Sequence, residues 1–377
     1  MGVGTAQVEK RSTILVSWIC IAVTKQNDLS KEIQDRVRQA AAARTALRIR
    51  GGDTKAFYGR TTTGEKLDVS GHRDIVSYEP TELVITARAG TPLDEVEAAL
   101  AEKGQVLPFE PPHFGKAATL GGAVACGLSG PSRPYSGAVR DLVLGVVCVN
   151  GRGERLSFGG QVMKNVAGYD VSRLMVGAMG TLGVLLEVSL KVLPRPATTV
   201  TLALATDADQ AITTMNAWAA QPLPISATCH DGELLRVRLA GAEQGVTAAR
   251  QKLGGEEVPD GDTFWAELRE HRLPLLSEAA TLWRLSVPAA APASAAEGTW
   301  LLDWGGAQRW FASELPADTI QQQAIALGGH ATLFRGGDRT GEVFHPLAPP
   351  IATLHRRLKQ AFDPDGILNP GRMYREW

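Results

Sequence analysis

The chain has 377 residues, of which 44% are hydrophobic and 21% charged, as expected for a globular protein of two domains with a large core. The formal net charge of -1 argues against a nucleic-acid binder or a strongly basic membrane-surface protein. The four cysteines are widely spaced and include no C-x-x-C pair, so neither an iron–sulfur cluster nor a disulfide framework is predicted. A reducing compartment, the cytoplasm, fits this cysteine usage.

Residues 1–27 are expected to form an extension ahead of the first domain. An apolar run at 14–23 follows Lys10 and Arg11, which is the order of charge and hydrophobicity in a signal peptide. The run is much shorter than the roughly 20 residues that a membrane span needs, and no A-x-A cleavage site follows it. We therefore expect a disordered or partly docked extension, with a signal peptide as the alternative.

Residues 28–196 predict a first domain of mixed helices and strands. A helix is expected at 30–42 with Ser30 at its start, and a helix is expected to open at Thr91-Pro92. Strands are expected at 46–50, 66–69, 83–87 and 184–192, and a hairpin is expected to pair 142–150 with 155–158.

After residue 196 the pattern changes to alternating strands and helices. Strands are expected at 198–205, 234–239, 282–287 and 300–304, and helices at 207–220 and 243–253. This alternation predicts an α+β cap domain over residues 197–345. Residues 346–377 are expected to return to the first domain as a C-terminal segment.

The segment Arg-Gly-Gly-Asp-Thr-Lys at residues 50–55 is a candidate phosphate loop. Its two glycines allow successive backbone amides to converge on an anion, and Thr54 and Lys55 add a hydroxyl and a charge. A strand that ends in a glycine turn is also common without any ligand. Taken by itself, the loop leaves both interpretations open.

A second glycine pair, Gly121 and Gly122, stands where an apolar helix is expected to begin. Free amides at a helix start bind a diphosphate well, but two glycines there also permit close helix–strand packing. No G-x-G-x-x-G or G-x-x-x-x-G-K-[ST] motif accompanies either glycine pair. A Rossmann dinucleotide site and a P-loop are therefore not predicted.

Further glycines occur in Lys-Asn-Val-Ala-Gly-Tyr-Asp at 164–170 and in Gly-Ala-Met-Gly-Thr-Leu-Gly-Val at 177–184. Backbone without side chains can lie against a flat ligand. Together with 50–55 and the tail Asn-Pro-Gly-Arg at 369–372, these segments resemble the FAD-binding domain of the vanillyl-alcohol oxidase/p-cresol methylhydroxylase (PCMH) flavoproteins. The order of these segments along the chain and their amino-acid sequences are similar to those of one branch, the FAD-binding E-type subunits of bacterial glycolate oxidase.

The resemblance covers nearly the whole chain from about residue 28. It implies an α+β fold with a PCMH-type FAD-binding domain of two subdomains and a smaller, ferredoxin-like cap domain. In that family the loop matching 50–55 holds the FAD diphosphate, and the segment matching 112–125 lines the ribityl chain. The cofactor-binding residues implied are Arg50, Gly51, Gly52, Asp53, Thr54, Lys55, Pro112, Ala118, Thr119, Gly121, Gly122, Ala125, Arg140, Asp141, Gly180, Thr181, Gly183, Val184, Asn369 and Arg372.

The resemblance also implies a function. It is the oxidation of a small 2-hydroxy acid, glycolate and also D-lactate, within a complex containing a D-type FAD subunit and an iron–sulfur subunit. Family members with covalent flavin carry a histidine in the first loop, whereas this loop has none, so non-covalent FAD is expected. No transmembrane segment is expected, and the complex would lie in the cytoplasm, associating peripherally with the inner face of the membrane through its partners.

The catalytic group is left open by the sequence. Related 2-hydroxyacid dehydrogenases have histidine pairs that bind a metal and accept the hydroxyl proton, and neither pattern is present, so no metal is predicted. His330 is a weak catalytic candidate, with a turn histidine as the stronger interpretation. Lys164, Tyr169 and Arg140 are candidates to hold a carboxylate, although Arg140 is also suited to a structural ion pair with Asp141.

Two accounts of the flavin follow from the missing histidine pairs. In one, the chain's own flavin oxidises the substrate, as in a stand-alone D-2-hydroxyacid dehydrogenase. In the other, which those missing pairs favour, the flavin relays or supports electron transfer from the D-type subunit. An NADPH-dependent sugar-nucleotide enolpyruvyl reductase and a subunit that has lost its flavin are the remaining alternatives.

Overall fold

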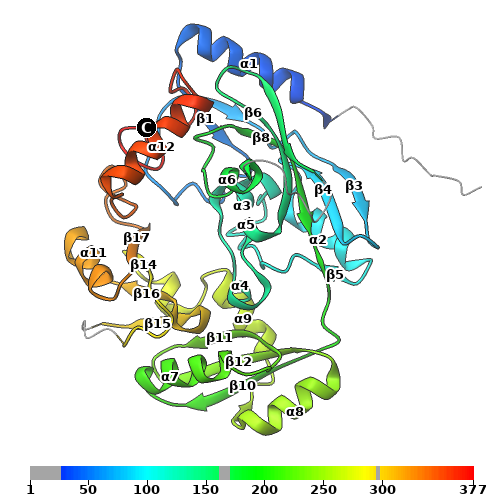
Figure 1. Cartoon of the computed structure of the whole chain (residues 1–377), viewed down its shortest axis with the longest axis vertical. Helices are drawn as coiled ribbons and strands as arrows, with labels where there is room; N and C mark the ends of the chain where they lie inside the picture. Colours follow the sequence, from blue (N-terminus) through cyan, green and yellow to red (C-terminus); the bar gives the residue numbers. More distant parts are fainter. Residues whose placement is uncertain (1–26, 161–169, 294–297) are drawn as a thin grey trace, which may run out of the picture.

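The computed structural model describes residues 27–160, 170–293 and 298–377, and Figure 1 shows them as an upper and a lower body stacked along the long axis. The upper body is built on a five-stranded antiparallel sheet in the order β3-β4-β8-β6-β7. Its strands are β3 (Ile75–Glu79), β4 (Val84–Arg88), β6 (Val143–Val149), β7 (Arg155–Gly159) and β8 (Val184–Lys191). The expected pairing of β6 with β7 is present in the structure.

Both faces of this sheet are covered. On one face, α1 (Ser30–Ala43) packs Ile33 and Val37 against Leu186 of β8 and against the parallel pair β1 (Leu47–Arg50) and β2 (Glu65–Asp68). The expected helix is present, but Leu29 rather than Ser30 is its N-cap. The reason is that the carboxylate of Asp28 accepts the Ser30 amide at 3.0 Å, so Ser30 becomes the first helical residue.

The other face of the sheet carries short helices. They are α2 (Leu93–Ala101), α3 (Leu120–Cys126), α4 (Arg133–Ser136), α5 (Val139–Leu142) and α6 (Val171–Met175). Apolar residues of α2, α3, α5 and α6 form the largest core cluster with Ile85, Leu185 and Val188 of the sheet. A small pair, β5 (Gln105–Val106) with β9 (Leu193–Pro194), closes this side before the chain enters the lower body.

The lower body contains an eight-stranded antiparallel sheet in the order β13-β10-β12-β11-β15-β16-β14-β17. The strands are β10 (Thr198–Ala205), β11 (Ile225–His230), β12 (Leu234–Gly241), β13 (Glu256–Glu257), β14 (Leu282–Ser286), β15 (Trp300–Asp303), β16 (Gln308–Ala312) and β17 (His330–Arg335). Within each four-strand half the spatial order is 4-1-3-2, and the halves join where β11 pairs with β15. The first half has the β-α-β-β-α-β succession of a ferredoxin-like unit.

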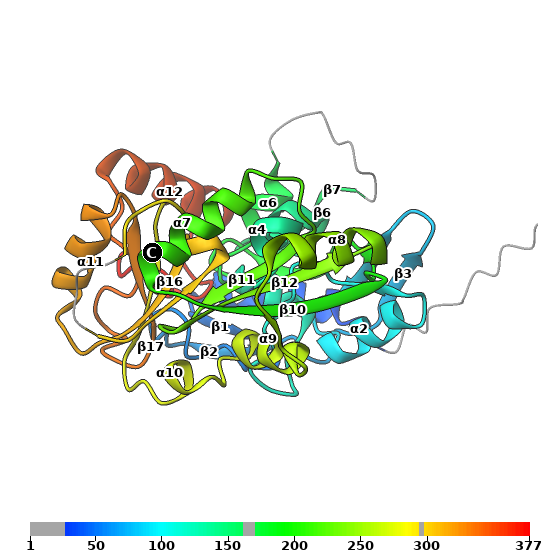
Figure 2. The ribbon, with the colours of Figure 1, turned by 90° about the horizontal axis from the view of Figure 1, so that it is seen from below.

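The two faces of the lower sheet have different roles. Figure 2 shows α7 (Ala208–Ala219) and α8 (Glu243–Leu253) lying across the outer face. On the inner face, α9 (Gly261–Arg269) contributes Trp265 and Leu268 to a core cluster that also contains Tyr58 and Met179 of the upper body. The remaining helices are α10 (Pro274–Ser277), α11 (Ala317–Ala326) and α12 (Pro349–Phe362). The two bodies therefore share one apolar interface.

The C-terminal segment returns to the upper body, where α12 lies beside the sheet (Figure 1). Buried Lys359 donates to the carbonyls of Thr181 and Leu368, both at 2.9 Å, and to the carboxylate of Asp363 at 2.6 Å. This buried ion pair fastens the tail to the loop before β8. No helix in the part of the chain described combines the length and apolar character that crossing a membrane requires.

Candidate functional site

A cavity lies within the upper body, between two opposing walls. One wall comes from β1 and the loop after it, the other from α3 and the loop before β8, and the tail closes one side. The lining residues are Arg48, Ile49, Arg50, Gly51, Gly52, Asp53, Thr54, Lys55, Ala56, Thr61, Thr62, Val69, Ala89, Thr119, Gly121, Gly122, Ala125, Cys126, Met179, Gly180, Gly183, Leu185, Asn369 and Arg372. Most of the residues implied by the resemblance are thus brought together.

The loop at 51–55 offers a row of unused backbone donors to this cavity. Among the contacts of the described chain, the amides of residues 51 to 55 donate to no protein acceptor. The loop is held from behind, since a Cβ added to Gly52 would lie 1.4 Å from the carbonyl oxygen of Ala117. Close backbone packing therefore fixes the loop, and its free amides suit an anion.

Two cations beside this loop form no salt bridge among the residues described, although the charge of Glu270 acts on Lys55 and that of Asp53 on Arg372. Lys55 is only 6% exposed, and its ammonium group donates to the carbonyl of His113 at 3.1 Å. Arg372 donates to the carbonyls of Arg60 at 2.8 Å and Ala56 at 3.0 Å. Burial lowers the pKa of both side chains, so an incoming anion would stabilise their charged forms.

Gly121 and Gly122 serve a different purpose at the start of α3. The amides of Leu120 and Gly121 donate to the carbonyls of Thr91 and Ala89, and the Gly122 amide donates to the Thr119 hydroxyl at 3.2 Å. A Cβ on Gly121 would lie 2.5 Å from the Cβ of Ala89. The close-packing interpretation therefore describes this glycine pair, and the free amides expected at the helix start are absent because neighbouring groups already satisfy them.

The tail supplies a bridge across the cavity. The side-chain amide of Asn369 accepts from the backbone amide of Ile49 at 2.8 Å and donates to the carbonyl of Met179 at 2.7 Å. Gly180 is packed against this bridge, since a Cβ there would lie 2.7 Å from Nδ2 of Asn369. Asn369 thus links the wall formed by β1 with the wall formed by the loop before β8.

The other implied residues do not line the cavity. Ala118 and Val184 are buried in core clusters, and Pro112 lines a small pocket between the two bodies. Arg140 and Thr181 line a second cleft beside α12, and the carboxylate of Asp141 accepts the Ala138 amide at 3.0 Å. The expected Arg140–Asp141 ion pair is not found between these two described side chains.

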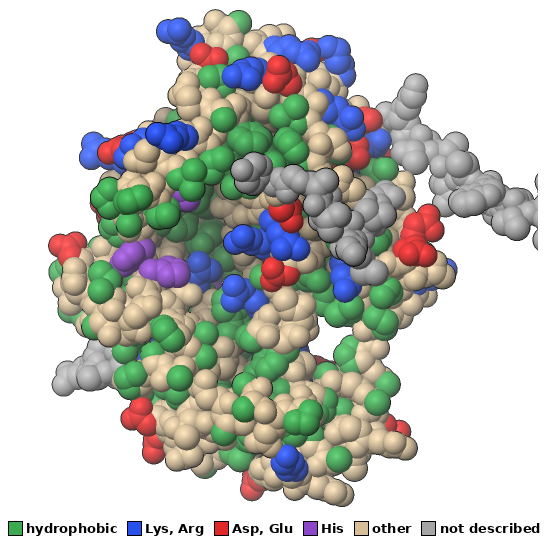
Figure 3. Space-filling model, in the orientation of Figure 1, with side chains coloured by type: hydrophobic (Ala, Val, Ile, Leu, Met, Phe, Trp, Pro, Cys, Tyr) green, Lys and Arg blue, Asp and Glu red, His purple; other side chains and the backbone are tan. Residues whose placement is uncertain are grey.

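The catalytic candidates are not at the cavity either. His330 is exposed at the start of β17, with its ring 6.3 Å from that of His345. Lys164 and Tyr169 lie outside the described residues. None of the chain's seven histidines, all within the described ranges, lines the cavity. Basic side chains and histidines gather instead along the hollow between the upper and lower parts of the face in Figure 3.

Sequence reasoning missed several lining residues, including Arg48, Thr61, Val69, Cys126 and Leu185. Cys126 lines the cavity close to Lys55 and Arg372. Burial raises the pKa of the Cys126 thiol, which keeps it protonated and unreactive. The only indication available in the sequence was adjacency to the glycine segments.

The geometry suits FAD, because free amides and two cations without a salt bridge can hold a diphosphate in a cavity that is also lined by apolar residues such as Ile49, Val69 and Leu185. The chain matches the model of an FAD-binding domain over residues 27–159 and that of the C-terminal domain of FAD-linked oxidases over residues 345–373.

Similar proteins agree with these matches. Glycolate oxidase subunit GlcE of Escherichia coli (strain K12) is 52% identical over 93% of this chain and 99% of its own length. Glycolate oxidase subunit GlcD of Bacillus subtilis (strain 168) is 34% identical, over 34% of this chain and 27% of its own. An alkyldihydroxyacetonephosphate synthase structure shares the fold, with a TM-score of 0.65 and 15% identity over 90% of this chain and 75% of its own.

Proposed function

Because the chain belongs to the family of glycolate oxidase subunit GlcE, we propose that it is the FAD-dependent subunit of a complex that oxidises glycolate to glyoxylate. D-lactate is the second substrate proposed. The observation that carries the proposal is the combination of free amides at residues 51–55 with buried Lys55 and half-buried Arg372, which favours a diphosphate inside an FAD-binding domain.

The cofactor is held without a covalent bond in this proposal. The residues that hold it are the free amides of 51–55, Lys55 and Arg372 at the diphosphate, with Thr119, Gly180 and Asn369 along the cleft. No histidine lines the described cavity, and the Cys126 thiol is kept protonated by burial. The segments 28–196 and 197–345 act as FAD domain and cap, with 346–377 as the returning tail.

The flavin of this chain relays or supports electron transfer with a D-type flavin subunit and an iron–sulfur subunit. Bound FAD supplies the capacity to accept the electron pair released when a 2-hydroxy acid becomes a 2-oxo acid. A base must lie within hydrogen-bond reach of the substrate hydroxyl, and none of the histidines lines the cavity. The complex is placed in the cytoplasm, at the inner face of the membrane through its partners.

A stand-alone D-2-hydroxyacid dehydrogenase is the second candidate. It is favoured by the D-2-hydroxyglutarate dehydrogenase of Xanthomonas citri, which is 33% identical over 178 residues, 46% of this chain and 38% of that protein. The two candidates differ in whether the isolated chain reacts with substrate.

Stopped-flow mixing of the FAD-loaded subunit with glycolate separates them. We expect no rapid bleaching of the flavin alone and turnover only after the D-type and iron–sulfur subunits are added. In the complex, His330→Ala should cost less than about tenfold in rate, below the roughly 10²–10⁴-fold loss of a general base. Rapid bleaching of the isolated subunit would make it the substrate-oxidising enzyme.

A further inference from the structure

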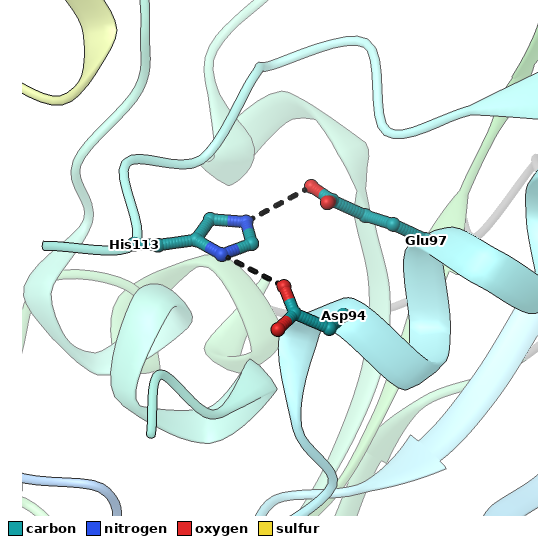
Figure 4. A group of neighbouring side chains, drawn as sticks. All are labelled: Asp94, Glu97 and His113. Carbon is teal, nitrogen blue, oxygen red and sulfur yellow. Dashed lines mark hydrogen bonds and ion pairs between the residues drawn. The ribbon is translucent and has the colours of Figure 1, made fainter. Parts of the chain in front are cut away.

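The ring of His113 is held between two carboxylates, as Figure 4 shows. Its Nδ1 lies 3.2 Å from Oδ1 of Asp94 and its Nε2 lies 3.2 Å from Oε1 of Glu97, one turn apart on α2. The His113 side chain is 14% exposed. Nε2 hydrogen-bonds the carboxylate of Glu97, and Asp94 lies at ion-pair distance from Nδ1, so the two negative charges favour a doubly protonated imidazolium.

The same three side chains are close enough together to suggest a metal site. A metal ion needs the lone pair of one ring nitrogen and carboxylate oxygens gathered about that same point. Here the two carboxylates lie at different nitrogens of the ring. The arrangement matches a cation between two anions better than a ligand set.

The backbone of His113 connects this ion cluster to the phosphate loop. The carbonyl of His113 accepts from the Thr54 hydroxyl at 2.8 Å and from the Lys55 ammonium at 3.1 Å. Lys55 is thereby aimed along the cavity wall beside the free amides. The position of the His113 carbonyl therefore determines where the loop places the Thr54 hydroxyl and the Lys55 ammonium group.

The lower body holds the same segment from the opposite side. Glu270, which follows α9 and has only 7% of its side chain exposed, accepts the amides of His113 at 3.2 Å and Phe114 at 2.9 Å. Phe114 has a φ of +53°, a conformation that non-glycine residues rarely adopt. Such a backbone persists only when its surroundings fix it, so the clamps on either side are needed.

We propose that His113 is a positioning residue for the cofactor, which in its protonated form fixes the carbonyl that orients Thr54 and Lys55 and so increases the affinity for FAD. The inference rests on the proposed cofactor site. It predicts a proton linkage: FAD binds more weakly once His113 is neutral, because a neutral ring no longer forms ion pairs with Asp94 and Glu97.

The charged groups around His113 set the pH range. The hydrogen bond with Glu97 raises the pKa of His113 above its ordinary 6.5, burial opposes this, the charges of Glu97 and Glu270 add to the rise, and Arg269 reduces it. Asp94 at Nδ1 and Lys55 beyond the carbonyl are the other charged groups nearby. Because the pKa of His113 in the folded apoprotein lies above 6.5, its contribution to FAD affinity is retained at pH 6.5 and is lost as pH rises above that folded pKa.

The test is an FAD titration of the apoprotein, followed by flavin fluorescence from about pH 6 to about pH 9. We expect the wild-type dissociation constant to rise about fivefold over this range, the value of an ion pair with partly exposed carboxylates. His113→Gln should bind with the weaker affinity at every pH. His113→Arg, which keeps the charge and several donors, should bind tightly at every pH. His345→Gln, at a histidine that does not line the cavity, is the matched control and should follow the wild-type curve.

A second set of measurements changes the pH at which FAD affinity falls. Glu97→Gln removes the main cause of the raised pKa and should shift the midpoint to lower pH, a change that a purely structural role would not produce. An equal pH dependence in His113→Gln would assign the proton to Lys55 and overturn the inference. Stoichiometric Zn²⁺ binding that Glu97→Gln abolishes would also overturn it, in favour of a metal site. Failure of the wild-type chain to take up FAD would overturn the cofactor site itself, and this inference with it.

Discussion

Two glycine pairs line the same cavity, at Gly51-Gly52 and at Gly121-Gly122, and they serve opposite purposes. In the first, the amides of residues 51–55 donate to no acceptor of the described chain, and these residues line the cavity. In the second, every one of the first amides of α3 is already bonded to the protein. A helix of only seven residues with satisfied amides has little to offer an anion.

This difference shows that a glycine pair in the sequence indicates a close approach of the backbone to another group. It does not indicate whether that group is a ligand or another part of the protein. Gly52 approaches the carbonyl of Ala117 and Gly121 approaches Ala89, so both are required by the protein itself. The two pairs differ in whether the neighbouring backbone amides already donate hydrogen bonds to the protein. Substitutions on each side of the cavity should therefore separate cofactor affinity from stability.

The largest effect is expected from Gly52→Ala. Its Cβ would lie 1.4 Å from a backbone oxygen, so the loop must move and the converging amides lose their geometry. We expect the loss of bound FAD, measured from the visible spectrum, and about 3 kcal/mol less free energy of unfolding. Gly245→Ala, with no atom within 4 Å of the new Cβ, is the control and should retain FAD. If Gly52→Ala still bound FAD stoichiometrically, the loop would be only a turn and would not hold the cofactor.

A smaller effect, confined to the cofactor, is expected from Lys55→Met. The ammonium group is buried without a salt bridge among the described residues, so its removal should leave the apoprotein as stable or more stable. FAD affinity should fall about 10- to 100-fold, the value of a hydrogen bond to a charged group. Lys116→Met removes an exposed lysine and should change neither quantity. Unchanged FAD affinity in Lys55→Met would contradict the assignment of the diphosphate to this loop.

The smallest effect is expected from Thr119→Ala, on the opposite wall. Its hydroxyl caps α3 by accepting the Gly122 amide, so its loss should cost about 1 kcal/mol of unfolding free energy. FAD affinity should stay within about threefold, because the amides of α3 are engaged elsewhere. Thr119→Ser keeps the cap and should restore stability in thermal unfolding. If Thr119→Ala lost tenfold or more FAD affinity and Thr119→Ser restored it, the start of α3 would contribute to FAD binding as the loop at 51–55 does. That result would contradict the proposed difference between the two walls.

Local sequence was enough to predict many elements. The strand at 198–205 and the helix at 243–253 have the predicted bounds, since their apolar periodicity and flanking residues are local. The α+β character of the cap was likewise predicted from local patterns, whereas the loop at 50–55 was left open between an anion loop and a turn until the family resemblance was added. Strands such as β11 and β17 were not, because their burial depends on neighbours far along the chain.

By itself, then, the sequence determined the family, the FAD cofactor and the loop whose backbone carries free donors. Only the tertiary structure decided which glycines face a ligand, because the amides of α3 are satisfied by Thr91 and Ala89, far from that helix start in sequence. It also decided that Asn369 bridges the cavity walls and that His113 lies between Asp94 and Glu97. Hydrogen-bond satisfaction and pKa depend on spatial neighbours, and periodicity along the chain specifies only the neighbours that are local.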